Sequence, residues 1–169
     1  MTAKACVRVL ALQPTARGLG YALFDGDKRL VDCGAYETRT DKNSKCLVKA
    51  ETLLALGTPT VVALENVHAK GARRKERIVT LIARLSNTAT ARACHVEPVS
   101  RLEVHAHFAG FGTGSKDDVA VAVATLYPEL KRRLPPRRRP WQAEHPRMAV
   151  FEAAAMGIVA QTRHMKDTA

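Results

Sequence analysis

The stretch that decides the fold reads Val7-Arg-Val-Leu-Ala-Leu-Gln13-Pro-Thr-Ala-Arg17-Gly18-Leu-Gly20-Tyr21-Ala-Leu23. Its first part, Val7–Leu12, is apolar apart from one arginine and includes two β-branched valines, which predicts a buried β-strand. The two glycines predict a turn, and Tyr21–Phe24 predicts a second strand that pairs antiparallel with the first. The polar Gln13 therefore stands directly after a buried strand, at the end of a sheet.

The rest of the chain alternates between strand and helix patterns. Asp25-Gly-Asp27 predicts a turn into a third strand, and Asn43-Ser44 offers an N-cap for the first helix. The segment 129–147 is rich in proline and arginine and predicts a loop or a partly disordered segment. The further strands are expected at Arg29–Tyr36, Thr60–Leu64 and Cys94–Val99, and the helices at 44–57, 74–92, from Ser100, from Ser115 to before Pro128, and 148–163. Strands first and alternating elements afterwards predict a single α/β domain over residues 1–169, with helices covering a mixed sheet.

Composition indicates a polyanionic partner. The chain has 27 Lys+Arg against 16 Asp+Glu, a formal charge of +11 and a pI near 10.0. Nucleic acid is the usual partner of so basic a protein. Its four cysteines lack the spacing of a zinc site and are expected to be free thiols, and no stretch has the length of a membrane span. We therefore expect a cytoplasmic protein without a membrane partner.

Four further positions have the residue types of a catalytic or binding site. Glu65 ends the strand over 60–64, where α/β folds place their ligands. Lys116 opens a helix directly after the glycine-rich turn Gly110–Gly114, where backbone N–H groups and a cation can meet a phosphate. Glu152 lies in the first turns of the last helix, and His145 precedes it by seven residues, which is two helical turns.

Four motifs, in the same order, resemble RuvC-like Holliday junction resolvases of the RNase H-like superfamily. The first stretch is similar to the family's Ile-Asp-Pro-Gly-Ser-Arg-x-Thr-Gly-Tyr, and Leu64-Glu65-Asn-Val67 to its Ile/Leu-Glu-x-Val. Gly110-Phe-Gly112-Thr-Gly-Ser-Lys116-Asp-Asp118-Val119 is similar to Gly-x-Gly-x-x-x-Lys-x-Gln-Val, and Glu152 falls on the last acid of Asp-x-x-Asp-Ala. The resemblance spans residues 7–160. It implies an RNase H-like mixed five-stranded sheet flanked by helices, binding of branched DNA and a homodimer.

The resemblance implies Gln13, Glu65, Lys116 and Glu152 as the catalytic positions. The family has four acids, and Gln13 and Ala149 stand where two of them are expected. Two-metal hydrolysis needs several anionic oxygens around ions about 4 Å apart. The sequence therefore predicts impaired nuclease chemistry, with Mg²⁺ or Mn²⁺ bound weakly if at all. Glu65 and Glu152 are the candidate metal ligands, with His145 as a third; otherwise His145 is a solvated residue at the start of a helix.

Basic residues form two clusters that predict contacts with a phosphate backbone. One cluster follows Glu65, and the other lies in the proline-rich segment, where Trp141 would either stack on an unpaired base or anchor the loop. The candidate nucleic-acid-binding residues are Arg17, Lys70, Arg73, Arg74, Arg77, Lys116, Arg137, Arg138 and Arg139.

Several functions stay open at this point. The favoured one is a binding protein for branched DNA, preferred over RNA, with a degenerate nuclease site. The alternatives are an active Mg²⁺-dependent structure-selective endonuclease in which Glu65 and Glu152 hold one ion, and an RNA-binding scaffold component of a larger complex. An actin-like ATPase would need a second domain of this kind. The stripe Ile78, Leu81, Ile82 and Leu85 would serve either a homodimer or the core.

Overall fold

The computed structural model describes residues 6–26, 29–112 and 114–167. Asp27 of the first predicted turn and Thr113 of the glycine-rich turn lie outside the described residues. Among the described residues, no helix is long and apolar enough to cross a membrane.

The centre of the fold is a five-stranded mixed sheet. Its strands are β1 (Arg8–Pro14), β2 (Gly18–Asp25), β3 (Leu30–Glu37), β4 (Val61–Glu65) and β5 (His95–Val99), in the order β3-β2-β1-β4-β5. The first three strands pair antiparallel, whereas β4 runs parallel to β1 and to β5. The predicted mixed-sheet α/β fold is confirmed. Because β1, β4 and β5 are parallel, their carboxyl ends meet at one edge of the sheet.

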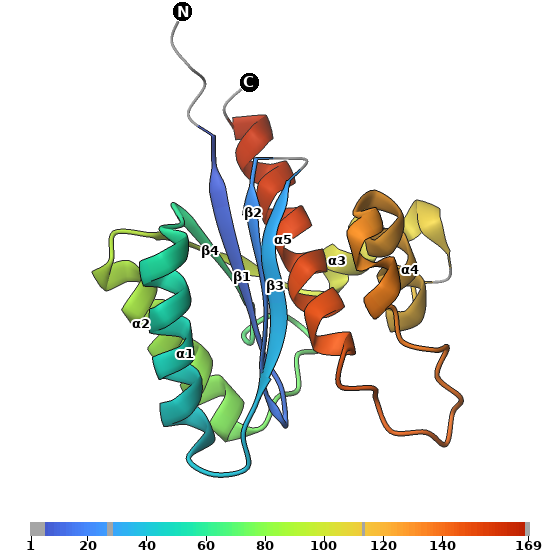
Figure 1. Ribbon diagram of the computed structural model, residues 1–169, viewed down its shortest axis with the longest axis horizontal. Coiled ribbons are helices and arrows are strands. Elements are labelled where there is room, and N and C mark those ends of the chain that lie inside the picture. The colour runs from blue at the N-terminus through green and yellow to red at the C-terminus, as the bar shows by residue number, and fades with distance from the viewer. Residues whose placement is uncertain (1–5, 27–28, 113, 168–169) are drawn as a thin grey trace, which may run out of the picture.

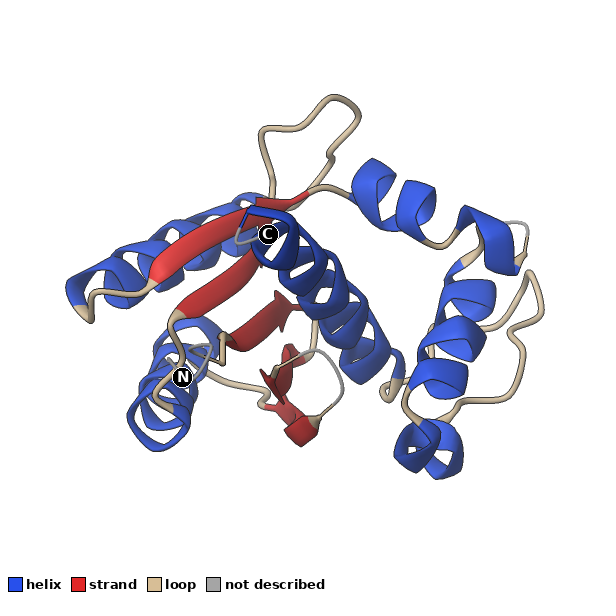
Figure 2. Ribbon diagram, turned by 90° about the horizontal axis from the view of Figure 1, so that it is seen from above, coloured by secondary structure: helices blue, strands red, loops and turns tan. Residues whose placement is uncertain are grey.

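Helices cover both faces of this sheet (Figure 1). On one face lie α1 (Lys42–Gly57) and α2 (Glu76–Ala91), and on the other lies α5 (Met148–Asp167). Beyond α5 stand α3 (Arg101–His107) and α4 (Lys116–Leu126), of which α4 packs mainly on α5 (Figure 2). The 3₁₀ turns η1 (Ala109–Phe111) and η2 (Pro128–Arg133) flank α4.

Strand β1 supplies both halves of the core because its side chains alternate between the two faces. Val9 and Ala11 pack toward α5, and Leu10 and Leu12 pack toward α1 and α2. All four are at most 1% exposed. A fully buried strand of this kind explains why the sequence there is a continuous apolar run.

The predicted loop over 129–147 is partly wrong, since its first residues form η2. Pro128 occupies the first turn of η2, where its missing N–H costs nothing, and Leu130 is buried in the core on the α5 side. The segment without helix or strand therefore begins at Leu134.

The predicted N-cap of α1 is also wrong. The helix begins at Lys42, after Asp41, which makes no side-chain capping bond. Asn43 lies inside the first turn and uses its amide for a tertiary contact: its Nδ2 donates to the Arg77 carbonyl at 3.1 Å, and its Oδ1 accepts from the Arg77 guanidinium at 3.0 Å. The amide thus ties α1 to α2.

The apolar stripe of α2 belongs to the core. Ile78, Leu81, Ile82 and Leu85 are at most 6% exposed and pack with the sheet and α1. Their burial within one chain decides between the two roles expected for the stripe. A homodimer would have to use other residues.

Helix α5 packs unusually close to the sheet at two glycines. A Cβ on Gly20 would lie 2.4 Å from the backbone oxygen of Ala149, and one on Gly157 would lie 2.4 Å from the buried ring of Phe24. These contacts seat the start of α5, and with it Glu152, directly against β2.

We predict that Gly20→Ala destabilises the protein by about 1–3 kcal/mol, because the added methyl must push the α5 backbone away from β2. Urea unfolding followed by circular dichroism measures the change. Gly110→Ala is the matched control, since nothing lies within 4 Å of a Cβ there. Equal stability of the two variants would contradict the close packing of α5.

Candidate functional site

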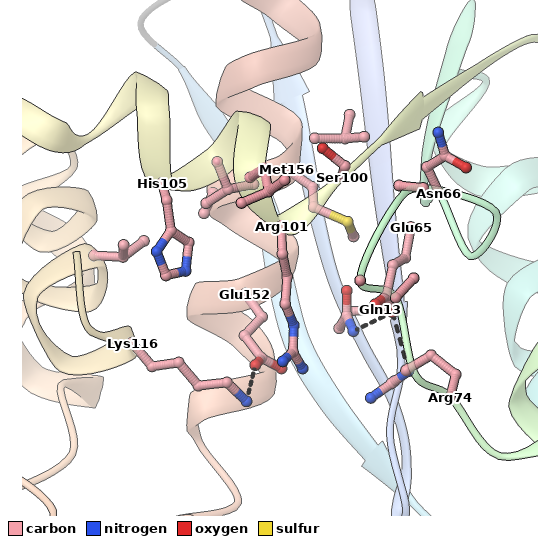
Figure 3. A pocket seen from close by; sticks show the side chains of 18 of the residues that line it. Gln13, Glu65, Asn66, Arg74, Ser100, Arg101, His105, Lys116, Glu152 and Met156 are labelled. Atoms are coloured by element: carbon pink, nitrogen blue, oxygen red, sulfur yellow. Dashed lines mark hydrogen bonds and ion pairs between the residues drawn. The ribbon is translucent and has the colours of Figure 1, made fainter.

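A cavity of about 530 Å³ opens at the edge of the sheet where the carboxyl ends of β1, β4 and β5 meet. Its walls come from the segment after β4, from the start of α3 and from α4 and α5 (Figure 3). The polar and charged side chains that line it are Gln13, Glu65, Asn66, Lys70, Arg73, Arg74, Ser100, Arg101, His105, Lys116 and Glu152. All four predicted catalytic positions therefore line one cavity.

Gln13 and Glu65 are neighbours because β1 and β4 are parallel and in register. Leu12 pairs with Leu64, so the next residue on each strand comes to the same place at the sheet edge. The Gln13 Nε2 donates to the Glu65 Oε2 at 3.3 Å and lies 3.4 Å from its other acceptor, the Pro14 carbonyl. Both side chains are buried, at 6% and 7% exposed. The Gln13 amide thus donates a hydrogen bond to the Glu65 carboxylate.

Arg74 gives Glu65 a cationic partner. The Arg74 Nε lies 3.1 Å from the Glu65 Oε2, at an angle that makes the contact an ion pair rather than a hydrogen bond. The same guanidinium donates from its Nη2 to the Pro14 carbonyl at 2.6 Å. Arg74 therefore contacts the same two acceptors as the Gln13 amide, the Glu65 carboxylate and the Pro14 carbonyl.

Lys116 pairs with the other acid. Its Nζ lies 2.5 Å from the Glu152 Oε1 and 2.8 Å from the Glu144 Oε2. Burial would lower the pKa of Lys116, but the two carboxylates outweigh it and raise that pKa above its ordinary value. The lysine therefore stays charged at neutral pH.

The donor set does not fit two divalent ions. Gln13 is neutral, Ala149 has no ligand atom, and each remaining acid already faces a cation of the chain. A two-metal site instead needs several carboxylates free to surround the ions.

His145 is not gathered with the two acids. It is exposed, and its Nδ1 accepts from the Arg147 N–H at 3.2 Å. It lines a smaller neighbouring hollow together with Glu144 and Glu152, but no three of the ligand atoms there lie within 4.8 Å of one another among the described residues. This position matches a solvated residue at the start of a helix.

The predicted nucleic-acid-binding residues differ in their positions and contacts. Lys70 and Arg73 are exposed and line the cavity, and Arg17 is exposed beside the neighbouring hollow. Arg77 lies outside the cavity, because its Nη2 donates to the Thr15 carbonyl at 3.0 Å while its Nη1 binds Asn43. Its contacts are those of a residue that secures the turn after β1.

The proline-rich segment projects from the body between α4 and α5 (Figure 1). Arg137 pairs with Asp118 at 3.2 Å, Arg138 donates to the Gln142 carbonyl at 2.6 Å, and Arg139 lies 5.7 Å from the Trp141 ring centroid. Trp141 is 76% exposed. The tryptophan therefore does not anchor this segment in the core and is accessible for stacking.

Sequence reasoning missed Arg101. It is the first residue of α3, and Figure 3 shows its side chain reaching down between Glu152 and Gln13. A capping box marks the start of this helix: the Ser100 hydroxyl accepts from the Glu103 N–H, and the Glu103 carboxylate accepts from the Ser100 N–H. The Ser-x-x-Glu spacing is visible in the sequence and could have placed Arg101 at the carboxyl end of β5.

The architecture matches that of Holliday junction resolvases. The chain superimposes on Thermus thermophilus RuvC with a TM-score of 0.69 at 18% identity, covering 95% of this chain and 97% of that one. It superimposes on T. thermophilus RuvC in complex with a Holliday junction substrate with a TM-score of 0.67 at 16% identity, covering 94% and 96%. For the yeast mitochondrial Holliday junction resolvase Ydc2 the TM-score is 0.57 at 11% identity, covering 96% and 83%.

No protein-family model matches the sequence, and no curated protein matches it significantly. The structural likeness extends over nearly the whole of each RuvC chain. The chain therefore has the RuvC-like variant of the RNase H-like fold, as the four sequence motifs predicted.

We predict that Gln13→Asp lowers stability more than Gln13→Asn when no divalent ion is present. The two variants have the same size, but the aspartate adds a second negative charge beside buried Glu65. At about 4 Å and an effective dielectric of about 20, such repulsion reaches at most about 4 kcal/mol, and Arg74 offsets part of it. Thermal unfolding with EDTA measures the difference.

Addition of millimolar Mg²⁺ should raise the melting temperature of Gln13→Asp and leave Gln13→Asn unchanged, since only the aspartate completes a carboxylate pair. Equal melting temperatures of the two variants under both conditions would contradict this account of the site.

Proposed function

We propose that this chain binds branched DNA of the Holliday-junction type and does not cut it efficiently. The RuvC-like fold supports the choice of substrate, because a RuvC of this fold has been solved with a Holliday junction substrate. The charge of the chain supports a nucleic-acid partner independently. The particular arrangement of charges in the cavity supports binding without cutting.

One observation carries the proposal: each acid in the cavity is paired with a cation from the chain itself. Arg74 faces Glu65, and Lys116 faces Glu152. A metal-dependent nuclease needs uncompensated carboxylates to attract its ions. The pairing of both acids with cations of the chain supports binding without metal-dependent cutting.

The lining as a whole favours an anion. Five basic side chains, Lys70, Arg73, Arg74, Arg101 and Lys116, surround the two acids. Phosphate oxygens of a DNA backbone would meet these cations directly, without a bridging metal. We therefore expect binding to persist in EDTA, without any divalent ion.

The projecting segment would extend the contact beyond the cavity. Arg137, Arg138 and Arg139 would grip phosphates without reading bases, and the exposed Trp141 would stack on a base that the branch leaves unpaired. Such contacts make recognition depend on shape and charge rather than on sequence. Two copies on one four-way junction would account for the expected homodimer.

The test is a gel-shift titration of an immobile four-way DNA junction and a linear duplex of equal length, each competed with structured RNA. We expect the junction to bind at least about tenfold more tightly than the duplex in EDTA. Equal affinity for junction and duplex would overturn the proposal. Stronger competition by RNA than by the junction would favour the RNA-binding scaffold instead.

We also predict that replacing Arg137, Arg138 and Arg139 together by alanine weakens binding and flattens its salt dependence. Each phosphate contact contributes about 0.9 to the slope of log K against log salt, so the slope should fall by roughly 1–3. Arg84→Ala with Arg92→Ala is the control, because these residues line neither the cavity nor the neighbouring hollow. An unchanged slope in the loop variant would show that this segment does not touch DNA.

A further inference from the structure

A second cluster of ligand-type side chains lies away from the cavity. His95 and Glu97 alternate on β5 and so point to one face of the sheet, and His164 reaches the same place from the last turn of α5. About twelve residues of helix, or about 18 Å of rise, separate His164 from Glu152 in the cavity. The cluster thus belongs to the opposite end of α5 (Figure 1).

Three ligand atoms converge there on one point. The Nε2 of His95 lies 3.2 Å and the Nε2 of His164 lies 3.1 Å from the same carboxylate oxygen, the Oε2 of Glu97. All three atoms lie within 4.8 Å of one another. In a tetrahedral zinc site with bonds of about 2.0 Å, neighbouring ligand atoms are about 3.3 Å apart. Two of the three distances between ligand atoms therefore already have the length that tetrahedral zinc requires.

We propose that His95, Glu97 and His164 form a site for a divalent transition-metal ion, with zinc as the natural occupant. Two imidazoles and one carboxylate are a known set of protein ligands for zinc, and a water completes the tetrahedron. The side chain of His95 is 61% exposed, which leaves an open path for that water and for the ion.

Neighbouring groups hold the carboxylate in position. The Arg163 Nη1 donates to the Glu97 Oε1 at 2.8 Å and to the Pro98 carbonyl at 3.0 Å, so it occupies the oxygen that faces away from the histidines. Arg163 also pairs with Glu103 of α3. Outer contacts of this kind orient metal ligands and tune their affinity.

The surroundings offset the charge of the ion. Glu97 and Glu103 carry two negative charges against the single positive charge of Arg163, which leaves a net negative charge. The carboxyl end of a long helix also favours a cation. A bound ion would link β5 to the end of α5. It would therefore stabilise the packing of the helix that carries Glu152.

The test is isothermal titration of ZnCl₂ into untagged full-length protein that has been stripped with a chelator. We expect one zinc per chain, and a melting temperature that rises with zinc. Cobalt in place of zinc should give the visible absorption bands of a tetrahedral ion. His95→Ala should weaken zinc binding at least about tenfold, as the loss of a ligand does at least as much harm as the loss of an outer contact.

Two variants separate this site from other possibilities. His68→Ala removes an exposed histidine outside the cluster and should bind zinc like the natural chain. Glu65→Gln removes an acid of the cavity and should also retain zinc. No saturable zinc binding, or equal binding by the natural chain and His95→Ala, would overturn the proposal, as would loss of zinc in Glu65→Gln.

Discussion

The parallel pairing of β1 with β4 is the constraint on which the rest of the site depends. It brings Gln13 beside Glu65 at the end of a strand pair whose other residues are almost wholly buried. Both side chains are buried there and in contact, so the charge of residue 13 acts directly on the Glu65 carboxylate. An amide donates a hydrogen bond to the acid, whereas a second acid would repel it unless a cation lay between the two or one of them bound a proton. The hydrogen bond from the neutral Gln13 and the ion pair with Arg74 thus together stabilise the buried charge of Glu65.

Helix α5 extends that constraint across the other face of the sheet. Gly20 and Gly157 let it approach β2 and β1 closely, which fixes Glu152 opposite Glu65. Lys116, at the start of α4, then closes the site by pairing with Glu152. The proposed metal cluster lies at the far end of the same helix, so one rigid element connects the cavity with the second site.

Much of the fold and part of the site could be predicted from the sequence. Apolar runs ending in a polar residue predicted β1 and β4, and the resemblance to RuvC-like resolvases implied that Gln13 and Glu65 belong to one site. The pairing of Arg74 with Glu65 depends on the path of an irregular segment, which no periodic pattern encodes. The cluster of His95, Glu97 and His164 joins positions more than sixty residues apart in the sequence. The α2 stripe looked the same for a core and for a dimer surface, since both bury the same apolar residues.

We propose that the chain's own cations take the place of catalytic metal ions, so that DNA is bound and left intact. The most direct measurement follows an immobile four-way junction, fully bound by the natural chain, on a denaturing gel after incubation with Mg²⁺ and with Mn²⁺. We expect intact strands with either ion. Paired nicks near the branch point that disappear in Glu65→Gln would contradict it, because two paired carboxylates would then suffice for catalysis.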